Sequence, residues 1–103
     1  MIFKLRKALN LYRYTTVGQL REIVMTMERE LGLSTLSHNE RDVLYAVQSV
    51  LGETKGVAKS DEIRSHDLVR DMSQPTFHRA LKSLLARDLL QHAPETKAGS
   101  YTI

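Results

Sequence analysis

The chain has 103 residues, enough for one small domain, and its 42% hydrophobic content can supply a single core. Lys and Arg outnumber Asp and Glu by 15 to 12, and this charge of +3 permits nucleic-acid binding without indicating it alone. The lack of cysteine excludes disulfides and thiolate zinc sites, and the apolar runs are too short for a membrane span or signal peptide. We therefore expect a soluble, cytoplasmic protein.

Residues 1–32 predict a helical extension ahead of the main domain. Residues 1–14 hold four basic and no acidic side chains, and their apolar positions recur every three or four residues, as in an amphipathic basic helix. We interpret it as a terminal helix that packs on its own domain, in preference to a membrane or phosphate contact. Thr16 and Gln19 form a possible capping box for a second helix that reaches Leu31 and is closed by Gly32.

The second predicted helix carries an apolar stripe with the spacing of a heptad repeat. Its members are Val17, Leu20, Val24, Met27 and Leu31. Two heptads do not establish a coiled coil, because a helix face that packs into its own core has the same pattern. Two interpretations stay open here, packing within the domain and a homodimer formed through the N-terminal helices.

Residues 33–103 predict the main domain, and its first helix begins at a capping box formed by Ser37 and Glu40. We expect this helix to end at Gly52. Its predicted buried positions are Val43, Leu44, Val47, Val50 and Leu51. Residues 53–59 have no periodicity and predict a loop, and residues 61–64 predict a short strand through Ile63.

Residues 65–90 predict a helix, a tight turn and a second amphipathic helix. Ser65 is the expected N-cap of a short helix that carries Leu68 and Val69. Ser73 is the expected cap of the second helix, at about residues 74–87, with Pro75 in its first turn. One face of this helix is apolar, with Phe77, Ala80, Leu81, Leu84 and Leu85.

The opposite face of the second helix is small, polar and basic, and it has no carboxylate. At 100° per residue it holds Pro75, Arg79, Lys82, Ser83 and Ala86, flanked by Thr76 and His78. A helix of this character fits the DNA major groove. Residues 89–93 and 100–103 then predict two strands of a hairpin with Lys97 at its tip.

The run Ser73-Gln74-Pro75-Thr76-Phe77-His78-Arg79, followed by Leu81, Leu84 and Leu89, resembles a known recognition-helix pattern. The pattern is S-x-P-T-hydrophobic-x-R-x-L-x-x-L of winged helix-turn-helix regulators, particularly MarR-like ones, and the resemblance covers roughly residues 37–103. It implies a mostly α fold with a small β-hairpin (α+β), in which residues 89–103 form the wing. MarR proteins continue past the wing into long dimerisation helices, whereas this sequence ends at Ile103, so their usual dimer and effector pocket are not implied.

We therefore expect sequence-specific binding of double-stranded DNA, with a role in transcriptional regulation. Arg79 and Thr76 are expected at base edges, with Ser65 and Lys97 at phosphates beside the groove. The remaining predicted contact residues, which meet base edges or phosphates or shape the start of the helix, are Ser73, Gln74, Pro75, His78, Lys82 and Ser83.

Two alternatives to DNA binding stay open. A winged helix can present the same face to a protein, although such a face tends to be apolar or acidic. RNA binding is less favoured because the tyrosines are too dispersed to form a stacking platform. We expect no enzyme activity, cofactor or metal, because the four histidines lack ligand spacing and there is no glycine-rich phosphate loop.

Overall fold

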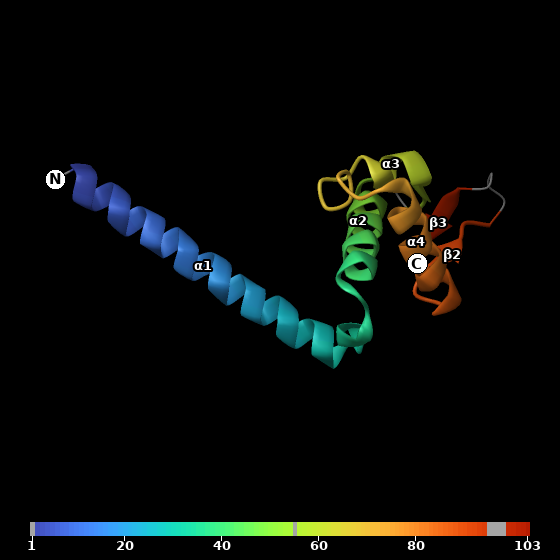
Figure 1. Ribbon diagram of the computed structural model, residues 1–103, viewed down its shortest axis with the longest axis horizontal. Coiled ribbons are helices and arrows are strands. Elements are labelled where there is room, and N and C mark those ends of the chain that lie inside the picture. Colours follow the sequence, from blue (N-terminus) through green and yellow to red (C-terminus); the bar gives the residue numbers. More distant parts are fainter. Residues whose placement is uncertain (1, 55, 95–98) are drawn as a thin grey trace. The chain divides into compact units, whose positions relative to one another are not determined.

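The computed structural model describes residues 2–54, 56–94 and 99–103, with side chains from residue 16 onward. It is mostly helical and contains one small antiparallel sheet (Figure 1). The chain divides into two compact units, Met1–Thr35 and Leu36–Ile103.

The first unit contains one long helix, α1 (Ile2–Glu30), followed by the short 3-10 helix η1 (Leu33–Thr35). The prediction of two helices was wrong, because α1 runs through Thr16 without a break and leaves no helix start there to cap. Gly18 lies inside α1, where its backbone freedom costs only about 1 kcal/mol and does not end the helix. Gly32 closes the helix as predicted, with a φ of 74°.

The predicted apolar stripe of α1 is exposed at every position. The exposed fraction of these residues ranges from 42% at Val24 to 68% at Leu31. The side chains of the basic stretch at residues 1–14 lie outside the described residues.

The second unit begins with α2 (His38–Thr54) and its predicted capping box. The Ser37 backbone N–H donates to Glu40 Oε1 at 3.0 Å, and the Glu40 N–H donates to Ser37 Oγ at 3.2 Å. The predicted inward positions Val43, Leu44, Val47 and Val50 are buried, whereas Leu51 is half-buried. The helix continues past Gly52, contrary to prediction, and Thr54 Oγ1 donates to the Val50 carbonyl in its last turn.

The segment after α2 differs from the predicted loop and strand. The strand β1 is Ala58–Lys59, and residues predicted as a strand form the short helix α3 (Ser60–Arg64). The Glu62 carboxylate accepts the Lys59 N–H at 3.2 Å, and with Asp61 it places two acidic residues in the first turn of α3, where they favour a helix.

Ser65 is a C-cap and not the predicted N-cap. It follows α3, and its hydroxyl donates to the Asp61 carbonyl at 2.9 Å. Residues 65–72 form successive turns and not a helix, with the N–H groups of Val69 and Arg70 both donating to the His66 carbonyl.

The helix α4 (Gln74–Ala86) agrees with the predicted second helix to within one residue at its end. Phe77, Ala80, Leu81 and Leu84 are buried as predicted. Asp88 ends the helix with a φ of 60°.

The sheet has the strand order β1-β3-β2 and is antiparallel throughout. The strands β2 (Gln91–His92) and β3 (Ser100–Thr102) form the predicted hairpin, and Tyr101 of β3 lies between His92 and Ala58. Residues 95–98, which include Lys97, lie outside the described residues.

The core of the second unit lies where α2 packs against α4, with α3 and the sheet beside them (Figure 1). The largest fully buried side chains come from α2, α3 and α4 and from the segments that follow α3 and α4: Phe77, Ile63, Leu84, Leu90, Val43, Val47 and Val69. Burial of large apolar side chains is the main favourable contribution to the stability of such a domain.

Candidate functional site

One face of α4 is exposed and carries most of the predicted contact residues. Its exposed members are Gln74, Pro75, His78, Arg79, Lys82 and Ala86. Thr76 and Ser83 are half-buried, and α4 contains no acidic residue. Five of the predicted contact residues are therefore exposed together on one polar and basic surface, with Thr76 and Ser83 half-buried beside them and Ser73 at the start of the helix.

The start of α4 is fixed by Ser73, the predicted N-cap. Its Oγ accepts the Thr76 backbone N–H at 3.3 Å and donates to Thr76 Oγ1 at 2.8 Å. The Thr76 hydroxyl can then donate its own proton to another acceptor. On the exposed face, the Gln74 side-chain amide lies 3.2 Å from Nε2 of His78, which is one helical turn further along α4. These two side chains therefore support each other.

Arg79 and Lys82 are cations that no acidic side chain neutralises in the part of the chain that the structure describes. The Arg79 Nε only donates to the Pro75 carbonyl of its own helix at 3.4 Å. By contrast, Arg70 lies 3.3 Å from Asp67, and Arg87 lies 3.4 Å from Glu40. Arg79 and Lys82 therefore give the exposed face of α4 a positive charge that its own residues do not neutralise.

Arg64 helps to hold α4 in position, and the sequence pattern does not reveal this role. Its Nη1 donates to the Val69 carbonyl at 3.0 Å and to the Met72 carbonyl at 2.8 Å. Its guanidinium also lies 5.1 Å from the centre of the Phe77 ring. One side chain thus connects the end of α3, the turns of residues 65–72 and the first turns of α4.

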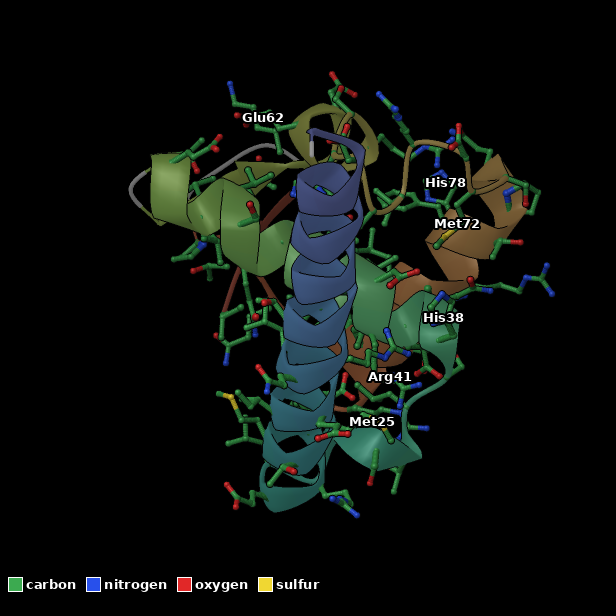
Figure 2. The ribbon with its side chains drawn as sticks, turned by 90° about the vertical axis from the view of Figure 1, so that its left-hand side faces the viewer. Met25, His38, Arg41, Glu62, Met72 and His78 are labelled. Atoms are coloured by element: carbon green, nitrogen blue, oxygen red, sulfur yellow. The ribbon has the colours of Figure 1, made fainter. Side chains whose placement is uncertain are left out.

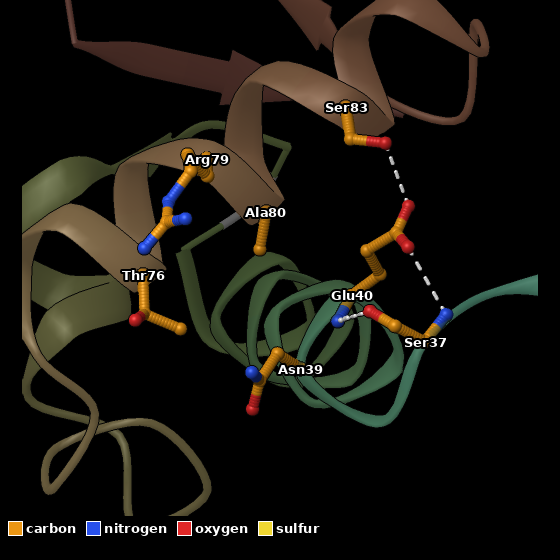
Figure 3. A pocket seen from close by; sticks show the side chains of 7 residues that line it. All are labelled: Ser37, Asn39, Glu40, Thr76, Arg79, Ala80 and Ser83. Carbon is orange, nitrogen blue, oxygen red and sulfur yellow. Dashed lines mark hydrogen bonds between the residues drawn. The ribbon is translucent and has the colours of Figure 1, made fainter.

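A pocket of about 270 Å³ lies between the start of α2 and the exposed face of α4 (Figure 3). It is lined by Ser37, Asn39, Glu40, Thr76, Arg79, Ala80 and Ser83. Asn39 was not predicted as a site residue, and its side chain is exposed in the first turn of α2. Only the fold, which sets α2 against α4, brings it near Arg79.

Glu40 accepts hydrogen bonds at one end of this pocket from Ser83 of α4 and from Ser37, which directly precedes α2. The Ser83 hydroxyl donates to Glu40 Oε2 at 2.7 Å, and the Ser37 N–H donates to Oε1 (Figure 3). These hydrogen bonds, that of Ser83 first, lower the pKa of Glu40 below its ordinary value of 4.5, and the charge of Arg87 contributes in the same direction. Ser83, predicted to contact DNA, therefore directs its hydroxyl toward α2.

Two predicted phosphate contacts are not brought to this face by the described structure. Ser65 is exposed at the end of α3 with its hydroxyl on the Asp61 carbonyl, and Lys97 lies outside the described residues. Among the described residues, no group of three or more His, Cys, Asp or Glu side chains gathers as a metal site would require. No described helix has both the length and the apolar character of a membrane span.

Comparisons with protein-family models, curated proteins and solved structures give no match to this chain.

Proposed function

We propose that Leu36–Ile103 is a winged helix-turn-helix domain that binds double-stranded DNA with α4 in the major groove. The observation that carries the proposal is the exposed face of α4, which holds Arg79 and Lys82 among neutral polar side chains and has no carboxylate of its own. Phosphates repel carboxylates, so a face that binds DNA benefits from their absence.

The order of the elements supports the same proposal. A first helix, a short strand, two further helices and a hairpin follow one another as α2-β1-α3-α4-β2-β3. In the winged-helix family that the sequence resembles, the hairpin is the wing and the last helix is the recognition helix. The segment between α3 and α4, which Arg64 holds, then corresponds to the turn of the helix-turn-helix motif.

The geometry refines the roles of the side chains. In this arrangement Arg79 and Thr76 contact base edges, and Gln74, His78 and Lys82 contact base edges or phosphates. Ser83 fastens α4 to α2 instead of contacting DNA directly. Asn39 joins the proposed contact residues, because its exposed side-chain amide borders the pocket beside Arg79.

Sequence-specific duplex binding by a small domain of this kind suits transcriptional regulation. The test of the proposal is fluorescence polarisation with genomic duplex fragments at two salt concentrations. We expect binding that weakens as salt rises, since counterions are released from the phosphates on binding. Binding that is absent at low salt would overturn the proposal.

Two substitutions resolve the roles on the α4 face. Arg79→Ala should cost about 1–3 kcal/mol of binding free energy on a preferred site and relax its sequence preference. Lys82→Ala should weaken binding to all duplexes alike and lower the slope against log salt by about 1.

Arg29→Ala is the matched control for these substitutions, because it removes one positive charge from the other compact unit. It should leave both the affinity and the salt slope close to those of the wild type. If Arg79→Ala and Lys82→Ala bound as tightly as Arg29→Ala, α4 would not be the recognition helix.

A further inference from the structure

Exposed apolar side chains are concentrated on one segment of α1. Of the nine large apolar residues exposed in the described part of the chain, seven lie between Val17 and Leu31. The other two, Leu68 and Ile103, belong to the second unit. A concentration of this kind is typical of an interaction surface.

Five of these residues form a continuous seam along α1. They are Val17, Leu20, Val24, Met27 and Leu31, with alternate spacings of three and four residues. In a coiled coil such positions alternate between the two seam positions, a (Val17, Val24, Leu31) and d (Leu20, Met27). Met25, labelled in Figure 2, lies off this seam, and Ile23 lies at its border.

The charges beside the seam indicate which partner fits. Arg21 and Glu28 lie one heptad apart at the same flanking position, next to the seam residues Val24 and Leu31. When two copies of a helix pair antiparallel about a two-fold axis, this flank of one copy faces the same flank of the other. Arg21 of each copy then lies opposite Glu28 of the second copy, so the pair of opposite charges occurs twice.

Other arrangements lack this complementarity. In a parallel pair the flanking residue Arg21 meets Thr16, and Glu28 meets Ile23, so no opposite charges face each other. In an antiparallel pair shifted by one heptad, Arg21 meets Arg21 of the second copy and the charges repel. The charges therefore select one direction and one register.

We propose that the protein forms a homodimer through antiparallel pairing of α1, with Val24 opposite Met27 and Leu20 opposite Leu31 of the second copy. The segment from Leu20 to Leu31 is complementary to itself in the spacing of its apolar residues and in the charges of Arg21 and Glu28, as a two-fold interface requires. This proposal is independent of the proposed DNA binding, because it concerns only the first unit.

Cysteine cross-linking of the full-length protein tests the direction, since the chain has no cysteine of its own. Val24→Cys and Met27→Cys are prepared separately and oxidised alone and as an equimolar mixture. A disulfide requires close Cα atoms, so we expect the mixture to form a covalent heterodimer several-fold faster than either variant forms a homodimer. Faster cross-linking of each variant with itself would show a parallel pair and overturn the proposal.

The register is tested by mixing Leu20→Cys with Val24→Cys. These positions oppose each other only when the pair is shifted by one heptad, so this mixture should cross-link more slowly than Val24→Cys with Met27→Cys. The reverse order of rates would overturn the proposed register, and a lack of cross-linking in every mixture would overturn the dimer.

Charge reversal gives a second test that is read out as solution mass. Arg21→Glu and Glu28→Arg should each weaken dimerisation several-fold, because each places two like-charged pairs across the interface. An equimolar mixture of the two variants should recover a dimer, since the heterodimer regains both pairs of opposite charge. The matched controls are Glu22→Arg and Arg29→Glu, which reverse neighbouring charges on the outer face of α1.

The outcomes of this test are distinct. Circular dichroism confirms that each variant keeps its helix content, and sedimentation at micromolar concentration gives its mass. A monomeric wild-type protein would overturn the proposal. So would Arg21→Glu and Glu28→Arg variants that dimerise as tightly as the controls.

Discussion

The Ser83 hydroxyl on α4 donates to Glu40 Oε2 on α2 at 2.7 Å, and this contact joins the two helices that form the core. The same carboxylate accepts the Ser37 N–H through its other oxygen. Glu40 therefore caps α2 and fastens α4 to it at once. Because α4 carries the proposed DNA-contact face, this one carboxylate helps to set where that face lies.

A double-mutant cycle on Glu40 and Ser83 measures this connection. Hydrogen bonds to charged groups contribute about 1.5–3 kcal/mol, and we expect a coupling free energy of about 1–2 kcal/mol between Glu40→Ala and Ser83→Ala. Urea unfolding followed by circular dichroism gives the four free energies of unfolding. Additive effects would contradict a direct bond, and Ser49→Ala, an exposed serine of α2, is the control.

Acid should weaken the second unit through Glu40. Its pKa is lowered in the folded protein, mainly by the Ser83 hydrogen bond, so the ionised form stabilises the fold above the ordinary value of 4.5. This contribution should be fully present near neutral pH and should be lost as the pH falls below 4.5 through the lower folded pKa. Glu40→Gln cannot ionise, so its stability should approach that of the wild type as the solution becomes acidic. A constant difference between the two at all pH values would contradict the role of the carboxylate.

The sequence predicts the helices that bury a regular apolar face, because side-chain periodicity directly reports which face meets the core. This is why α2, with its capping box, and α4, with Phe77 and Leu84 inward, agree with the predictions. The hairpin of β2 and β3 follows from its turn-rich centre in the same way.

The errors fall where local sequence patterns compete. Thr16 has the side chain of an N-cap, but the helical residues on both sides continue α1 through it. Ile63 suits a strand by its branched side chain, yet the acidic residues beside it favour the first turn of α3. At such short segments the neighbouring residues decide the structure.

The candidate site is predicted only in part because some of its contacts join distant residues. The exposed face of α4 follows from helical periodicity, whereas the turn of Ser83 toward Glu40 requires α2 to pack against α4. Arg64 carries no signal of its own in the sequence, because an arginine that binds main-chain carbonyls has no characteristic spacing.

Arg64→Ala should destabilise the second unit and disturb the start of α4. The substitution leaves the carbonyls of Val69 and Met72 without their charged donor and removes the contact with the Phe77 ring. We expect a loss of about 2–3 kcal/mol in the free energy of unfolding. Arg64→Lys should recover part of this loss, because its ammonium is a donor but lacks the planar guanidinium. Arg70→Ala, which breaks an exposed ion pair, should cost less than about 1 kcal/mol, and an equal loss in both alanine variants would contradict the role of Arg64.

Asp88→Gly should stabilise the protein by relieving the end of α4. The Leu89 N–H donates to the Leu84 carbonyl and the Asp88 N–H to the Leu85 carbonyl, which is the hydrogen-bond pattern of a Schellman motif. The residue at this point is normally glycine, but here Asp88 adopts a φ of 60°, and a side chain in that conformation costs roughly 1–2 kcal/mol, less for Asp than for most residues. We expect a gain of about 0.5–1 kcal/mol for glycine, measured as the midpoint of urea unfolding, with the added freedom of the unfolded chain offsetting part of the relief. Asp88→Ala is the control, because it removes the carboxylate but keeps the Cβ atom and should give no such gain. If alanine stabilised the protein as much as glycine, the benefit would come from the lost charge and not from the backbone.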